Sequence, residues 1–144
     1  MITGVFKSIL ISLGIACIFQ FFLYHIQSDS VHQFLKSNIT NLQIALLALN
    51  TATLGIVLTK IRELIDKTGE KEAFHTTRNE MLLSIKEQVV LIIASLVIIA
   101  IESAKKLAFE ISPEVFHTLL IASFTYSIII LYDTAKSVFV ILDY

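Results

Sequence analysis

Long apolar stretches separated by short polar segments dominate the pattern of hydrophobic and polar positions along this chain. A helix needs about 20 mainly apolar residues to cross the roughly 30 Å hydrocarbon core of a bilayer, because unpaired backbone groups are too costly in lipid. Four segments meet this requirement, namely residues 5–26, 39–60, 84–105 and 114–134. The pattern therefore predicts an all-α fold, an integral membrane four-helix bundle that forms a single domain.

Polar residues beside these stretches predict where the helices begin and end. Asn38 or Asn41 is the expected N-cap of the second span. A polar helical hairpin is expected over residues 61–83, and Gly69 is expected to end its first arm. The Ser-Pro-Glu sequence that begins at Ser112 has a capping residue, a proline for the first helical position and an acid that complements the helix dipole. It therefore predicts the start of the fourth helix.

The composition indicates that lipid is the solvent for much of the surface. Hydrophobic residues make up 56% of the chain against 16% charged residues, and the mean hydropathy is +0.80, which is more than a soluble domain of this size can bury. The formal net charge of −1 provides no cationic field that would attract nucleic acid. A lone cysteine, Cys17, excludes an intramolecular disulfide. We expect the lipid bilayer to be the main partner and direct nucleic-acid binding to be absent.

Lysine and arginine are unevenly distributed between the two sides that four crossings define. The side with both termini and the 59–88 connection holds Lys7, Lys60, Arg62, Lys67, Lys71, Arg78, Lys86 and Lys136, and the other side holds Lys36, Lys105 and Lys106. Basic residues in short loops stay preferentially in the cytoplasm. The distribution therefore predicts a multi-pass protein with both termini in the cytoplasm.

The expected hairpin carries apolar residues at helical spacing in both arms. Their spacing suits a direct pairing of the arms. The residues are Ile61, Leu64 and Ile65 on one arm, and Phe74, Leu82 and Ile85 on the other. Closure of the hairpin is the default interpretation, and a docking surface for a cytosolic protein is the alternative. The candidate docking residues in the hairpin and the C-terminal tail are Phe74, Arg78, Phe139 and Leu142.

Small residues recur at helical spacing in the first two spans. Helices associate in lipid by close van der Waals approach and interhelical hydrogen bonds, which small residues permit. The candidates for packing or oligomer contacts are Gly4, Ser8, Ser12, Ala16, Ala48, Asn50, Ala52 and Gly55. Four short helices leave little room for all these faces inside one subunit, so we expect a homo-oligomer. Ordinary packing within the subunit is the alternative.

Two polar residues of the spans require partners. A carboxamide in mid-membrane, such as that of Asn50, is expected to link helices by hydrogen bonds, and the alternative is that it lines a pore or a ligand cavity. Glu102, near the outer end of the third span, is expected to pair with Lys106 four residues further on.

Motifs of catalysis and metal binding are missing from the sequence. His25, His32 and His117 are expected on the outer side, where such groups can titrate or bind a metal, but their spacing matches no ligand pattern. The sequence has no HExxH pair, no glycine-rich phosphate loop and no nucleophile beside a base. We therefore expect a protein that is not an enzyme, with no metal, no cofactor and no evident small-molecule substrate.

Three classes of function fit these features. The first is a membrane anchor and sensor subunit that oligomerises and recruits a cytosolic partner through the hairpin and the tail. The second is an oligomeric pore or channel lined by Asn50 and the threonines of the second span. The third is a small transporter, and a four-span immunity protein against a pore-forming toxin would share the same outline.

The second span reads NLQIALLALNTATLG over residues 41–55. This segment, the chain length, the four spans and the lack of catalytic motifs resemble the tetraspan KwaA membrane subunits of the bacterial anti-phage defence system Kiwa. The resemblance lies in topology over the whole chain and carries over no functional residue. It implies an oligomer in the bacterial inner membrane that acts in antiviral defence with a cytosolic, DNA-binding KwaB-like partner.

Overall fold

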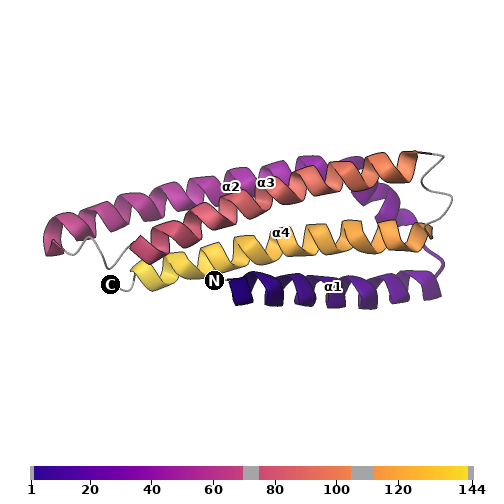
Figure 1. Ribbon diagram of the computed structural model, residues 1–144, viewed down its shortest axis with the longest axis horizontal. Coiled ribbons are helices and arrows are strands. Elements are labelled where there is room, and N and C mark those ends of the chain that lie inside the picture. The colour runs from indigo at the N-terminus through magenta and orange to yellow at the C-terminus, as the bar shows by residue number, and fades with distance from the viewer. Residues whose placement is uncertain (1, 70–74, 105–111, 143–144) are drawn as a thin grey trace.

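The computed structural model describes residues 2–69, 75–104 and 112–142, and this part of the chain contains four helices and no strand. The helices are α1 (Ile2–His25), α2 (Ser30–Thr68), α3 (His75–Ser103) and α4 (Pro113–Leu142). Each contains a stretch that is long and apolar enough to cross a membrane. Figure 1 shows them extended along one axis, with the first residues of α1 and the last of α4 toward the same end. The predicted all-α, four-helix membrane fold is confirmed.

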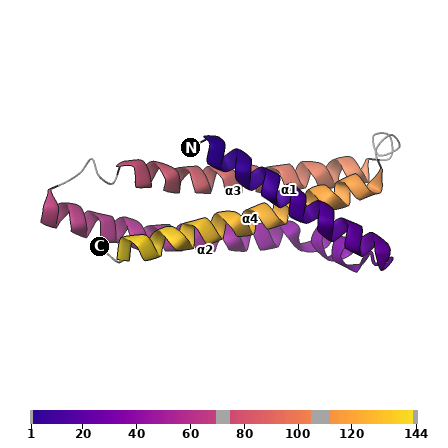
Figure 2. The ribbon, with the colours of Figure 1, turned by 90° about the horizontal axis from the view of Figure 1, so that it is seen from below.

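The bundle is built around α4. This helix packs against α1, α2 and α3, whereas α1 packs mainly against α4. Figures 1 and 2 show α1 on the side of α4 away from α2, crossing α4 obliquely. At this contact Ala16 of α1 is buried in a cluster with Ile121 and Ala122 of α4. Three helices, α2, α3 and α4, therefore enclose the interior in which the polar residues lie.

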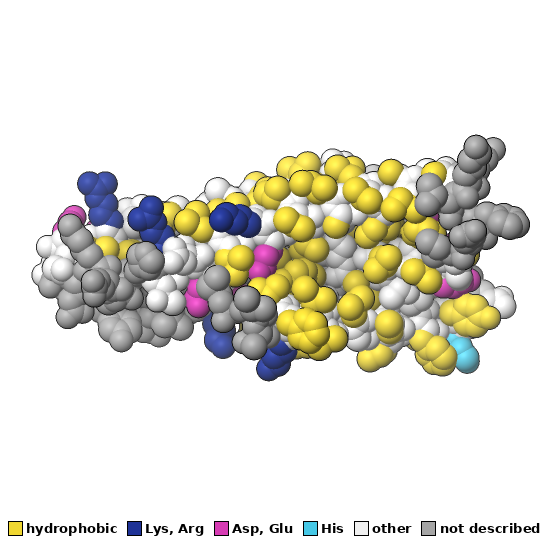
Figure 3. Space-filling view, in the orientation of Figure 1, with side chains coloured by type: hydrophobic (Ala, Val, Ile, Leu, Met, Phe, Trp, Pro, Cys, Tyr) yellow, Lys and Arg dark blue, Asp and Glu magenta, His cyan; other side chains and the backbone are white. Residues whose placement is uncertain are grey.

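The outer surface of the bundle is apolar. Large hydrophobic side chains on every helix are exposed, among them Phe6, Ile18, Ile56, Val90 and Tyr132. Figure 3 shows hydrophobic side chains over the middle and right of the visible face, with the lysine and arginine side chains gathered toward the left. Exposure of so much apolar surface to water is unfavourable by about 25 cal/mol per Å². The protein is therefore a multi-pass membrane protein.

The start of α2 differs from the prediction. The helix begins at Ser30, well before the expected caps, and Asn38 and Asn41 both lie inside it. The side-chain amide of Asn38 donates to a backbone carbonyl one turn earlier, so the predicted asparagine cap is wrong. Leu35 and Ile39 are buried one turn apart. Packing of this apolar stripe keeps the segment helical although it is too polar to resemble a span.

The other predicted helix ends agree with the structure. Gly69 follows α2 in the left-handed conformation with φ 75°, and its N–H donates to the carbonyl oxygen of Ile65 at 2.8 Å. Glycine adopts this conformation without the steric cost that a Cβ atom brings. At the other end of the molecule, α4 begins at Pro113 as predicted.

The two arms of the hairpin close on each other. Their apolar residues, with neighbours from the spans and α4, form a cluster of Leu54, Val57, Ile61 and Met81, surrounded by Leu64, Ile65, Ile85 and Val138. Leu82 instead remains exposed. The packing supports the default interpretation of these apolar residues, and most of them are not available as a docking surface.

Candidate functional site

The most deeply buried side chains of the bundle are mainly polar. The largest of those with almost no exposed surface are Ile39, Leu120, Gln43, Gln88, Asn50, Ser95 and Ser127. Amides and hydroxyls predominate in this set, whereas the surface is apolar. Polar side chains inside a membrane protein are costly to bury and are commonly kept for function. The interior between α2, α3 and α4 is therefore where we look for a site.

A spacing of seven residues places polar side chains on one face of α2 and one face of α3. The sets are Lys36, Gln43 and Asn50 on α2, and Gln88, Ser95 and Glu102 on α3. Seven residues are about two helical turns, so the members of each set face the same way. Because α2 and α3 run in opposite directions (Figure 1), the first member of each set lies near the last member of the other.

Gln43 connects three helices at the middle of the bundle. Its amide nitrogen donates to the hydroxyl oxygens of Ser123, at 2.9 Å, and Ser127, at 3.2 Å, on α4. The hydroxyl of Ser123 also lies 2.8 Å from that of Ser95 on α3. These four side chains form a continuous hydrogen-bonded layer.

Asn50 forms the next layer, two turns further along α2. Its Nδ2 donates to Oε1 of Gln88 at 3.0 Å and lies 3.4 Å from the hydroxyl oxygen of Ser84, both on α3. Asn50 therefore links helices, as expected of a buried carboxamide. Thr51 is exposed and donates to a carbonyl of its own helix. Asn50 and Thr51 face different directions, so they do not line one shared conduit.

The Gln43 layer and the Asn50 layer together make up what we call the polar file. Its members are Gln43, Asn50, Ser84, Gln88, Ser95, Ser123 and Ser127. A cleft of about 440 Å³, here called the carboxylate cleft, opens beside the Asn50 layer. Glu80, Glu87 and Asp133 line it, and the described lining includes no lysine or arginine. The Tyr126 hydroxyl donates to Oε2 of Glu87 at 3.0 Å.

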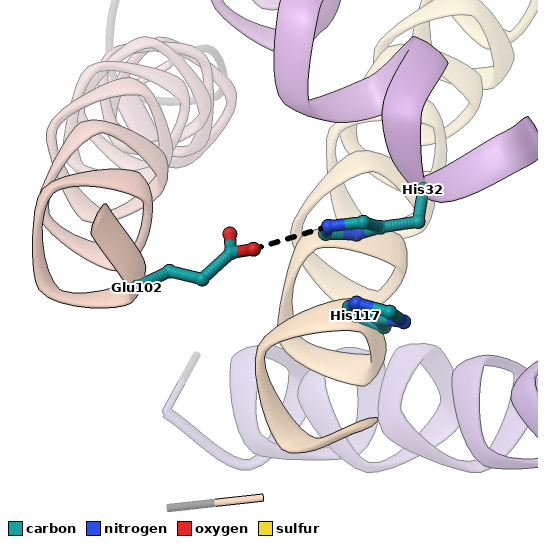
Figure 4. A group of neighbouring side chains, drawn as sticks. All are labelled: His32, Glu102 and His117. Atoms are coloured by element: carbon teal, nitrogen blue, oxygen red, sulfur yellow. Dashed lines mark hydrogen bonds and ion pairs between the residues drawn. The ribbon is translucent and has the colours of Figure 1, made fainter. Parts of the chain in front are cut away.

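His32, Glu102 and His117 meet at the opposite end of the file, and we call them the histidine cluster. Figure 4 shows Glu102 reaching from α3 toward His32 on α2, with His117 on α4 beside it. Nε2 of His32 lies 3.2 Å from Oε1 of Glu102, and the two imidazole rings stack with centroids 3.4 Å apart. One possible ligand atom from each residue lies within 4.8 Å of the others. These are the described residues best arranged to hold a metal ion.

Glu102 has partners other than the one expected. Its Oε1 accepts a hydrogen bond from Nζ of Lys36 at 2.7 Å, in addition to the contact with His32. Lys106 lies outside the described residues, and α3 ends at Ser103. The expected pair with Lys106 therefore stays a prediction.

A cleft of about 470 Å³, here called the histidine cleft, opens beside the histidine cluster. His25, His32 and His117 line it, together with the acids Asp29 and Glu114. The polar file therefore lies between two clefts, one at each end of the bundle.

Every level of this arrangement contains a buried polar atom that has no hydrogen-bond partner among the described residues. On α2 and α3 these atoms are His32 Nδ1, Gln43 Oε1, Asn50 Oδ1, Glu87 Oε1, Gln88 Nε2 and Glu102 Oε2. A seventh, Oε1 of Gln20 on α1, belongs to a residue that lines the histidine cleft. Each such atom costs about 1–3 kcal/mol unless it finds a partner. Internal water molecules satisfy groups of this kind in many proteins.

The predicted packing residues divide between the interior and the surface. Ser12, Ala16 and Asn50 are buried, and Ser8 is half-buried, whereas the exposed ones are Gly4, Ala48, Ala52 and Gly55. Among the docking candidates, Arg78 is exposed. Phe74 lies outside the described residues, and so do the side chains of Phe139 and Leu142.

Sequence reasoning missed the polar file and the histidine cluster. The seven-residue spacing of Lys36, Gln43 and Asn50 is visible in the sequence and was a usable signal for the file. No local pattern connects His32 with His117, because they lie on different helices and meet only through the fold.

Comparisons with protein-family models, with curated proteins and with solved structures gave no match for this chain. The resemblance to KwaA subunits therefore stays a prediction. Function has to be inferred from the polar file and the two clefts.

Proposed function

We propose that this protein conducts protons across the membrane along the polar file of a single subunit. The observation that carries the proposal is a row of buried, partly unsatisfied polar side chains between two clefts. From His32 to Asn50, eighteen residues of α2 cover about 27 Å at 1.5 Å per residue, close to the thickness of the hydrocarbon core. The polar file and the histidine cluster together are thus long enough to connect the two membrane surfaces.

The chemistry of the middle of the file favours a proton over a hydrated ion. Amides and hydroxyls such as those of Gln43, Ser95 and Ser123 both donate and accept hydrogen bonds, as a relay with intervening water requires. These side chains are buried and bonded to one another, and they line neither of the two clefts. A proton moves along hydrogen bonds and needs no wide passage at this level.

Titratable groups at both ends of the file support the same proposal. Imidazoles and carboxylates exchange protons with water at ordinary pH, and the histidine cluster stands at one end. Glu87, bonded to Tyr126, stands at the other with Glu80 and Asp133 nearby. In the orientation predicted from the basic residues, the carboxylate cleft faces the cytoplasm. Protons would be exchanged at the histidine cluster on one side and at Glu87 on the other.

Proton uptake into liposomes tests this proposal. The full-length protein is reconstituted with a pH-sensitive dye inside, and valinomycin with a potassium gradient sets the membrane potential. We expect faster proton uptake than in empty liposomes. We expect at least a roughly tenfold loss in Asn50→Leu, because an apolar side chain in the file raises the barrier to a proton by about 1.4 kcal/mol or more.

The matched control is Thr51→Leu, which changes the exposed neighbour of Asn50 and should leave the flux unchanged. Each variant is compared at equal amounts of reconstituted protein with equal helical content. If Asn50→Leu conducts as well as the unaltered protein, the polar file is only a packing feature and the proposal fails.

A second proposal, a membrane anchor that recruits a cytosolic partner, is favoured by the length of α2. Its 39 residues extend about 58 Å, nearly twice the hydrocarbon thickness. The part beyond the bilayer exposes Arg62, Glu63, Asp66 and Lys67. The arms bury most of their apolar residues, so a partner would bind mainly through charge. The resemblance to KwaA subunits fits this role.

Co-purification in a mild detergent tests the anchor proposal. We expect a stoichiometric soluble protein that dissociates at high salt and is absent when the four charged residues are replaced by serine and glutamine. Purification without any such protein contradicts the anchor proposal and leaves the proton proposal unaffected.

A further inference from the structure

The histidine cluster has the composition of a metal site, and we propose that His32, Glu102 and His117 bind a divalent cation of the zinc class. The three side chains come from α2, α3 and α4, respectively, and converge at one end of the bundle (Figure 4). This inference concerns binding alone, and it does not rest on the proposed proton pathway.

The ligand set fits zinc in type and number. Neutral imidazole and carboxylate are preferred zinc ligands, and sites with three protein ligands keep a fourth position for water or another ligand. Metal–ligand distances of about 2.1 Å allow two ligands of one ion to lie at most about 4.2 Å apart. The 3.2 Å between His32 and Glu102 is within this limit, and a limit of 4.8 Å for the whole group requires only small side-chain rotations.

Burial and missing partners distinguish the cluster from a chance surface grouping. His32 is only 8% exposed, and its Nδ1 has no hydrogen-bond partner among the described residues. The same holds for Oε2 of Glu102. Both atoms offer lone pairs, and leaving them unpaired at this depth costs free energy. A bound cation would use such lone pairs and remove the cost.

The histidine cleft gives a cation access to the cluster. It is open to the outside of the bundle, and its lining includes Asp29 and Glu114 in addition to the three histidines. Acidic side chains at the mouth of a cleft raise the local concentration of cations. The site therefore has an approach route of suitable charge.

Lys36 competes with the cation for Glu102. Its ammonium donates to Oε1 of Glu102 at 2.7 Å, and its side chain is 37% exposed. In the metal-free protein this contact compensates the negative charge of the Glu102 carboxylate. The long side chain of Lys36 can move into water when a cation arrives. Removal of the lysine charge should therefore tighten cation binding, a gain that damage to the fold cannot produce.

Titration of the full-length protein in detergent with Zn²⁺, and with Co²⁺ as a spectroscopic probe, tests the inference. The protein carries a tag without histidine. We expect one ion per chain and the visible absorption bands of four-coordinate Co²⁺. His117→Gln should weaken binding roughly 100-fold or more, and Lys36→Gln should strengthen it about tenfold.

His25→Gln is the matched control. His25 is an exposed histidine at the same end of the bundle, and its ring makes a tilted contact with that of Phe21. It lines the histidine cleft but is not one of the three clustered ligands, so its loss should leave the affinity unchanged. Absence of Zn²⁺ binding below about 100 µM overturns the inference. It is also overturned if binding survives His117→Gln, or if His25→Gln weakens binding as much as His117→Gln does.

Discussion

The face of α2 that points into the bundle carries polar side chains, and the face that points outward is apolar. A helix on the surface of a soluble protein has the reverse arrangement. Gln43 and Asn50 lie on the face that points into the bundle, where they bond to the other helices. Ala48, Ala52 and Gly55 lie on the face that points outward and is exposed. A soluble amphipathic helix buries its apolar stripe instead. The inner face is therefore suited to chemistry inside one subunit, and the outer face to close contact with another helix in the membrane.

Gln43→Leu should give the largest effect and tests the inner face at its middle layer. The substitution removes the amide that joins Ser123 and Ser127, and it places an apolar side chain in the layer of the file that lines neither cleft. We expect proton flux in liposomes to fall at least about tenfold. Ile44→Leu, at the exposed neighbour, is the control and should conduct normally. Equal flux in the two variants would remove the functional difference between the faces.

Gly55→Leu tests the outer face and should act on association between subunits. A Cβ atom at Gly55 meets no other atom within 4 Å in the subunit, so the fold itself can accept a side chain there. If the small-residue face forms the expected homo-oligomer, a bulky residue should weaken association by roughly 1–2 kcal/mol.

The weakened association is measured as the mass of the protein in detergent over a range of protein concentrations. Gly14→Leu is the control, because Gly14 on α1 also has open space around it but lies outside both small-residue stripes. An oligomer that is unaffected by Gly55→Leu, or a protein that is monomeric from the start, contradicts the role assigned to the outer face.

Asn50→Ala sharpens the comparison by measuring what the inner face contributes to stability. The substitution leaves Oε1 of Gln88 without its donor, as well as removing the contact with Ser84. We expect the free energy of unfolding to fall by about 1–2 kcal/mol in a reversible detergent denaturation. Ala48→Val on the outer face should change it much less. A larger loss for Ala48→Val would reverse the assignment of the two faces.

Gly69→Ala should have the smallest effect and leave both faces intact. Gly69 has φ 75°, so a Cβ atom there costs about 1 kcal/mol by backbone strain alone. We expect a small fall in the stability of the hairpin, measured by hydrogen exchange at the end of α2, with unchanged proton flux. Gly55→Ala, at a helical glycine without positive φ, is the control and should not destabilise the chain.

Hydrophobic pattern alone was enough to predict the architecture. Each span is a long apolar stretch whose backbone must bond internally in lipid, so helices at these positions are the necessary solution. Local signals also fixed the end of α2 at Gly69 and the start of α4 at Pro113. The start of α2 at Ser30 escaped prediction because its first turns are polar overall. These turns are held by tertiary contacts, namely the packing of Leu35 and Ile39 and the contacts of His32 and Lys36 with Glu102.

The candidate site was only partly accessible from the sequence. The need of Asn50 for a partner followed from its depth in the span, but Gln88 and Ser84 could not be identified without the packing of α2 on α3. Most of α2 and all of α3 lie between His32 and His117 in the sequence. Their contact depends on how α2 and α4 pack. The spacing of residues in the sequence shows which side chains share a face of one helix. It does not show which residues of two different helices meet, because that depends on the fold.

The reversal potential of single reconstituted bilayers tests the central claim most directly. With equal potassium chloride on both sides and a pH difference across the bilayer, conduction of protons along the polar file predicts a reversal potential that shifts by about 59 mV per pH unit. This shift should disappear together with the current in Asn50→Leu and persist in Thr51→Leu. A reversal potential that stays near zero, or a current no larger than that of protein-free bilayers, would contradict the account.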